Sequence, residues 1–116
     1  MAKSSRDSKD FKSFSAGRPI FTEGELGDVM YIVAEGEVDI LVQGTVIETV
    51  ASGGILGEMA LIDNKARSAT ALAKTDCKLL PINLTHFVFL VQESPSFAIQ
   101  VMKVMADRLR YMNTRL

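Results

Sequence analysis

Short β-prone runs separated by glycine turns occupy the first two thirds of the chain. This pattern limits the possible folds of the chain more than any other feature of the sequence. All eight glycines lie between Gly17 and Gly57. Apolar and polar residues alternate in part of these runs, as in Val38–Val42, which is the period of a half-buried strand. Strands this short, each followed by a turn, are typical of antiparallel rolls and sandwiches. The pattern predicts strands at residues 19–22, 29–33, 38–42, 46–50, 68–73 and 77–82.

After Ile82 the periodicity becomes helical. Asn83 is a suitable N-cap for a helix from Leu84 to about Gln92. Ser94 followed by Pro95 then starts a second helix, which carries an apolar stripe to about Asn113. The predicted fold is therefore mainly β with flanking helices: an antiparallel β-roll, of the double-stranded β-helix or jelly-roll type, with C-terminal helices.

The domain organisation follows from composition. Residues 1–10 are polar, which predicts a flexible N-terminal arm. Residues 11–116 are predicted to form a single domain, with the β-roll at about 11–82 and the closing helices at about 83–113. Hydrophobic residues make up 47% of the chain, enough for one core.

Charge and apolar run lengths exclude several function classes. A formal net charge of −1 argues against a basic nucleic-acid surface. No run reaches the roughly 18 apolar residues of a membrane span, and the polar N-terminus lacks the apolar stretch of a signal peptide. We expect a cytoplasmic protein.

One cysteine and one histidine limit the chemistry that the chain can perform. Cys77 has no partner for an internal disulfide and is expected to be a buried small hydrophobe. His86 is expected to be exposed and receives no function. A single imidazole argues against a metal site built on several histidines. No metal, no catalytic residue and no enzymatic activity are predicted, because nothing supplies a hydrolytic metal or an activated nucleophile.

The segment from Gly53 to Thr70 contains the residues with the clearest chemistry. Gly57 permits a close backbone approach, and Glu58–Leu61 can form a helical turn whose free N–H groups would face an anion. Arg67 offers a planar guanidinium suited to phosphate, although a lone arginine is more often a solvated surface residue. Glu58 would repel a phosphate and suits a sugar hydroxyl instead, unless it only complements the helix dipole. A phosphate beside a sugar hydroxyl indicates a nucleotide.

The order and spacing of these residues resemble a known cassette. Gly57-Glu58-Met59-Ala60-Leu61 followed by Arg67-Ser68-Ala69-Thr70 is similar to the phosphate-binding cassette of cyclic-nucleotide-binding domains. This is the module of the catabolite activator protein, of the regulatory subunits of cyclic-AMP-dependent protein kinase and of cyclic-nucleotide-gated channels. The resemblance extends from about Phe14 to Asn113. Ala66 departs from the family, where many members have proline, and little helix-forming sequence precedes Phe14.

The resemblance implies a soluble module that binds a 3′,5′-cyclic nucleotide, with cyclic AMP favoured over cyclic GMP. Arg67 would bind the phosphate and Glu58 the ribose 2′-hydroxyl, while Ser68 would contact the phosphate or the base or simply lie in a strand. The C-terminal helix would move over the base, with Met112 covering the ring, Asn113 bonding a base edge and Arg108 reaching the base or phosphate. In the alternative, Arg108, Arg110 and Arg115 only complement the dipole at the C-terminal end of the helix. Ile40, Ile47, Val50 and Leu56 are expected in the core, some of them also lining the base pocket. The predicted ligand-binding residues are Ile40, Ile47, Val50, Leu56, Gly57, Glu58, Met59, Ala60, Arg67, Ser68, Ala69, Arg108, Met112 and Asn113.

Two alternatives stay open at this point. The chain could be the sensor domain of a catabolite-activator-type transcription regulator without its DNA-binding part, or an interaction protein with the same fold and no ligand. No direct contact with nucleic acid is expected, because the long helix leaves no room for a helix-turn-helix before Leu116. The partners implied are the nucleotide, an effector protein of unknown identity and a second copy bound through the C-terminal helix.

Overall fold

Two antiparallel four-stranded sheets make up the β-roll of the computed structural model, which describes residues 10–115, with side chains to residue 111. One sheet has the strand order β1-β8-β3-β6 and the other β2-β7-β4-β5. The strands are β1 (Lys12–Phe14), β2 (Pro19–Phe21), β3 (Val29–Glu35), β4 (Val38–Val42), β5 (Thr45–Val50), β6 (Ile55–Leu56), β7 (Thr70–Ala73) and β8 (Cys77–Asn83). The predicted mainly β fold, an antiparallel roll with C-terminal helices, is confirmed.

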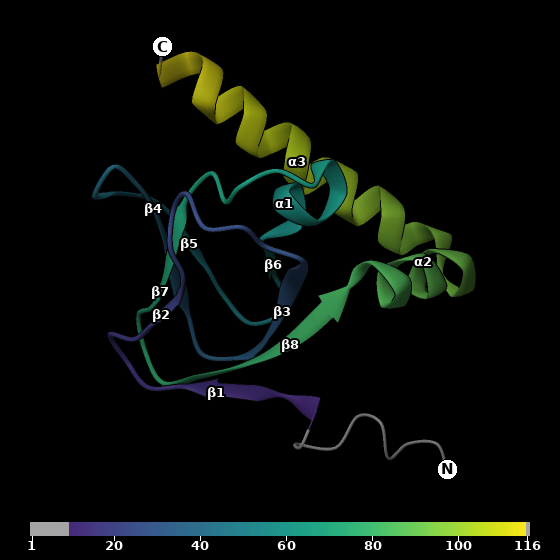
Figure 1. Cartoon of the computed structure of the whole chain (residues 1–116), viewed down its shortest axis with the longest axis horizontal. Coiled ribbons are helices and arrows are strands. Elements are labelled where there is room, and N and C mark those ends of the chain that lie inside the picture. Colours follow the sequence, from purple (N-terminus) through teal and green to yellow (C-terminus); the bar gives the residue numbers. More distant parts are fainter. Residues whose placement is uncertain (1–9, 116) are drawn as a thin grey trace.

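The two sheets pack face to face around one apolar core. Buried side chains from both sheets meet there, among them Tyr31 and Leu79 of the first sheet and Val38 and Ala71 of the second. Strand β1 pairs with β8, which is distant in sequence, and this pairing places Lys12 opposite Leu79. The first and last strands of the roll therefore lie side by side (Figure 1).

The helices cover one side of the roll. They are α1 (Glu58–Asp63), α2 (Leu84–Glu93) and α3 (Pro95–Arg115). The side chain of Asn83 accepts a hydrogen bond from the backbone N–H of His86, which confirms the predicted N-cap of α2. Apolar residues of α1 and α3 complete a second core with Met30 and Ile82 of the first sheet. The long helix α3 runs over the roll past α1, so that it lies above the segment singled out by the sequence (Figure 1).

Some element boundaries differ from the sequence-based prediction. The strand predicted at 68–73 begins only at Thr70, because its pairing with β4 ends at Thr70 opposite Leu41. The two-residue strand β6 is too short to show a periodicity and was not predicted. The arm predicted at residues 1–10 lies, apart from Asp10, outside the described residues.

The lone cysteine and the lone histidine lie where the sequence predicts. Cys77 is buried at the start of β8, and burial raises the pKa of its thiol. His86 is exposed in the first turn of α2. Among the described residues, no helix is long and apolar enough to cross a membrane.

Candidate functional site

Gly57 sets the start of α1 and thereby the position of Glu58. Its φ of 78° lies in the left-handed region, which side-chain-bearing residues rarely adopt. A Cβ at this position would stand 2.7 Å from Nη1 of Arg67. Glu58 follows as the first residue of the helix and is only 1% exposed. The glycine therefore lets the cassette turn sharply while the arginine packs against its backbone.

Arg67 is a buried side chain and not a solvated surface arginine. Only 6% of the residue is exposed, and its guanidinium carbon lies 4.1 Å from the centre of the Phe21 ring. Nη1 donates to the carbonyl of Gly57 at 3.1 Å and Nη2 to that of Val29 at 2.8 Å. Burial lowers the pKa of Arg67, and the nearby acidic groups oppose that shift. A guanidinium has five N–H donors, so these two bonds leave further donors for an anion.

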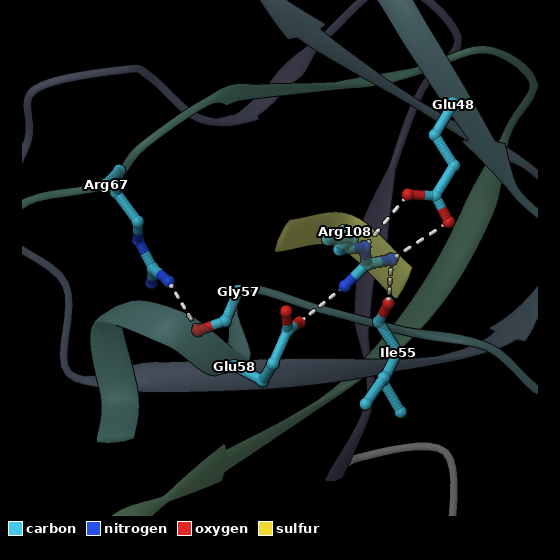
Figure 2. A network of polar contacts seen from close by, with 6 residues as sticks. All are labelled: Glu48, Ile55, Gly57, Glu58, Arg67 and Arg108. Atoms are coloured by element: carbon cyan, nitrogen blue, oxygen red, sulfur yellow. Dashed lines mark hydrogen bonds and ion pairs between the residues drawn. The ribbon is translucent and has the colours of Figure 1, made fainter. Parts of the chain in front are cut away.

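A second arginine, Arg108, joins α3 to the cassette (Figure 2). Its Nη1 donates to Oε1 of Glu58 at 2.6 Å, and its Nη2 donates to the carbonyl of Ile55 at 2.8 Å. Nε and Nη2 donate to the two carboxylate oxygens of Glu48 at 2.9 and 3.1 Å. Burial acts to lower the pKa of Arg108, but the bonds and attractions to Glu48 and Glu58 outweigh it and raise the pKa. One cation thus ties α3 to β5, β6 and α1.

Two adjoining pockets lie between α3 and the roll. The larger, of about 300 Å³, is lined by Ile40, Val42, Ile47, Glu48, Met59, Ser68, Ala69, Val104, Asp107, Arg108 and Tyr111. The smaller, of about 50 Å³, is lined by Phe21, Ile40, Leu56, Gly57, Glu58, Met59, Ala60, Arg67, Ser68, Ala69 and Arg108. They share five lining residues, so they form one continuous site. Glu58 and Arg67 line the smaller pocket, and the larger one combines apolar side chains with Glu48, Asp107 and Arg108. The size of the larger one lies at the lower end of the range for small-molecule pockets.

Most residues predicted from the sequence line these pockets. Those that do are Ile40, Ile47, Leu56, Gly57, Glu58, Met59, Ala60, Arg67, Ser68, Ala69 and Arg108. Val50 lies in the core between the sheets and lines neither pocket. The predictions for Met112 and Asn113 concern side chains outside the described residues.

Glu48 is a pocket residue that the sequence reasoning missed, and a shift in strand pairing explains why. Ile40 pairs with Glu48, but the next residue, Leu41, pairs with Val46, so Ile47 is an extra residue in β5. Such a bulge re-aims the side chains around it. Strict alternation would place Ile47 and Glu48 on opposite faces, whereas both line the larger pocket.

Phe21 was also missed as a site residue. The sequence places it in a short strand far from the cassette, and only the pairing of β2 with β7 brings its ring under Arg67. Across the described residues, no group of three or more His, Cys, Asp or Glu side chains is arranged to hold a metal ion.

The comparison with known families agrees with this geometry. The model of the cyclic nucleotide-binding domain matches residues 11–94, which includes the whole roll and the cassette. The chain belongs to the cyclic nucleotide-binding domain family.

Individual relatives share this module at moderate identity. The chain is 33% identical over 102 residues to the cyclic AMP receptor protein of Thermus thermophilus, covering 84% of this chain and 47% of that protein. It is 37% identical over 93 residues to a cyclic nucleotide-gated potassium channel of Rhizobium etli, covering 80% of this chain and 26% of the channel. The chain thus spans less than half the length of these curated relatives.

A solved structure supports the same relationship. The crystal structure of the Thermus thermophilus catabolite activator protein superposes with a TM-score of 0.78 at 30% identity, covering 93% of this chain and 54% of that one.

Proposed function

We propose that the chain is a regulatory module that binds a 3′,5′-cyclic nucleotide, with cyclic AMP favoured over cyclic GMP, and that it is not an enzyme. The observation that carries the proposal is the joint burial of Arg67 and Glu58 in one small pocket, which opens into a larger pocket with Ile40, Ile47 and Val104 in its wall. A cyclic nucleotide has a charged phosphate and a ribose hydroxyl, which suit Arg67 and Glu58, and a flat base, which suits the wider pocket beside them. Membership of the family and the name of the cyclic AMP receptor protein support the ligand class.

Each end of the ligand has a chemically matched partner in this proposal. The donors that Arg67 keeps free of Gly57 and Val29 bind the phosphate. Glu58 accepts a hydrogen bond from the ribose 2′-hydroxyl with a lone pair not used by Arg108, since a carboxylate can accept about four hydrogen bonds. The base lies in the larger pocket against Ile40, Ile47 and Val104.

Titration calorimetry with matched nucleotides tests this proposal. We expect cyclic AMP to bind more tightly than cyclic GMP and more tightly than 2′-deoxy cyclic AMP. The deoxy analogue leaves a buried carboxylate without its donor, which costs about 1–3 kcal/mol, or roughly 5- to 150-fold in Kd. In the Glu58→Gln variant, the Kd values of cyclic AMP and 2′-deoxy cyclic AMP should become similar. Equal binding of cyclic AMP and its deoxy analogue by the unmodified chain would remove Glu58 from the ligand contacts. Absence of binding to all three would favour the interaction protein without a ligand.

We further propose that α3 closes on the bound nucleotide. The helix supplies Val104, Asp107, Arg108 and Tyr111 to the wall of the larger pocket, so a base placed there contacts it. Ligand contacts with α3 raise the cost of its local opening.

Hydrogen exchange measures that closure. On addition of cyclic AMP we expect slower exchange in residues 105–113 of α3 as well as in residues 56–69. The strand β1, far from both pockets, is the internal reference and should exchange at the same rate with and without ligand. Protection confined to residues 56–69 would mean that the ligand is held without movement of α3.

The domain organisation and the partners complete the proposal. Residues 11–116 act as a single domain with residues 1–10 as an arm, in the cytoplasm, and the effector is a further protein or a further domain. A homodimer would use the outer face of α3, where Ile99, Met102 and Leu109 recur at helical spacing and are each about half exposed. A transcription regulator with this sensor would need a DNA-binding part beyond these 116 residues.

A further inference from the structure

Glu48 of β5 holds Arg108 in a way that no other residue of the network does. Its two carboxylate oxygens accept from Nε and Nη2 of the same guanidinium, so the pair is bidentate (Figure 2). The five N–H groups of a guanidinium lie in one rigid plane. A bidentate bond along one edge therefore fixes the rotation of the whole group, including the direction in which Nη1 donates to Glu58.

These contacts thus form a series of hydrogen-bonded side chains, from the exposed rim of the pocket to its buried end. The side chain of Glu48 is 38% exposed, that of Arg108 15% and that of Glu58 2%. The exposed carboxylate orients the arginine, and the arginine orients the buried carboxylate. Glu48 also reaches this position only because of the extra residue in β5, which turns it into the pocket together with Ile47.

We propose that Glu48 is a positioning residue that sets the selectivity of the site for the ribose 2′-hydroxyl, acting through Arg108 on Glu58. The inference rests on the proposed function, because it assigns a ribose contact to Glu58. Glu48 acts through Arg108 in this proposal, since both of its oxygens accept from that guanidinium.

The amide of glutamine is the sharpest change at this position. Glu48→Gln keeps the size and one acceptor oxygen, but its NH2 group faces the N–H donors of Arg108, so the bidentate bond is lost. We expect cyclic AMP to bind about three- to tenfold more weakly, because a partly exposed ion pair contributes modestly. Binding of 2′-deoxy cyclic AMP should change less than twofold, since that ligand makes no bond to Glu58. The ratio between the two ligands should therefore fall by about three- to tenfold.

The control variant makes the same carboxylate-to-amide change at another position in the sheet that contains β5. Asp39→Asn converts a carboxylate on β4 that accepts from Thr49 and lines neither pocket. This variant should leave the affinity for both ligands and their ratio unchanged. Glu48→Gln in an Arg108→Met background should likewise leave the ratio unchanged, because the arginine that links Glu48 to Glu58 is missing. Melting temperatures of all variants show whether each is folded.

The outcomes separate this inference from the proposed function. Equal losses for both ligands in Glu48→Gln would make Glu48 a structural residue and overturn the inference while the function stands. A change in the ratio of cyclic AMP to cyclic GMP with no change in the ribose ratio would place Glu48 on the base and overturn it as well. An unmodified chain that binds no nucleotide would overturn both the function and the inference.

Discussion

Replacement of Arg67 by alanine is expected to weaken cyclic AMP binding by about 30- to 1000-fold. Arg67 is 6% exposed and lines the smaller pocket, so a bond to the phosphate would form with little competition from water. Loss of a charge-assisted bond in such a place costs on the order of 2–4 kcal/mol, which corresponds to that range of Kd. Arg67→Lys should restore part of the affinity, because a point charge cannot reproduce the planar fork.

Calorimetry on folded variants measures this effect, and the exposed Arg18 offers a matched control. Arg18→Ala removes the same charge from the residue just before β2, which lines neither pocket, and should bind as the unmodified chain does. Arg67→Ala also leaves the carbonyls of Gly57 and Val29 without this donor, so its melting temperature must be measured alongside. Unchanged affinity in a folded Arg67→Ala variant would exclude Arg67 as the phosphate ligand.

Replacement of Arg108 by methionine is expected to lower the free energy of unfolding by about 3 kcal/mol in the absence of any ligand. The substitution keeps much of the apolar stem but leaves Glu58, which is 1% exposed, as a buried charge without its cation. Removal of one partner from a buried ion pair is costly for this reason. In a domain of this size the change corresponds to a fall in melting temperature of about 10 °C.

A double variant separates the loss of the ion pair from a general effect on α3. Glu58→Gln combined with Arg108→Met removes both charges, and its stability should recover by more than half of the loss. Arg110→Met, an exposed arginine on the same helix, should leave the melting temperature within about 1 °C. If the double variant were as unstable as Arg108→Met, the cost would come from packing of the helix and not from the orphaned carboxylate.

The parts of the fold that follow from local sequence were predictable. The N-cap at Asn83 and the start of α3 at Pro95 depend on residues adjacent in the chain, and both are where the sequence predicts them. The order of strands within the sheets depends instead on pairings between distant segments, such as β3 with β8. No local pattern specifies which of several similar strands becomes a neighbour.

Some residues of the candidate site were likewise predictable from local sequence, and others were not. Gly57, Glu58 and Arg67 could be chosen because they lie in one short cassette with a recognisable order. Glu48 could not, because its place in the pocket depends on an extra residue in β5 that breaks the strand period. Val50 shows the converse, since an apolar strand residue near the site lies in the core between the sheets and not in the pocket.

The pairing of β1 with β8 also determines when the roll can assemble. The hairpin of β4 and β5 joins residues close in sequence and can form early, whereas Lys12 must wait for Leu79 before it gains a partner. Closing so long a stretch of chain loses entropy before any contact repays it, and such long-range β pairing makes folding slow. During synthesis, the edge of β1 therefore stays unpaired until β8 has left the ribosome, and the two sheets close only after most of the domain has been made.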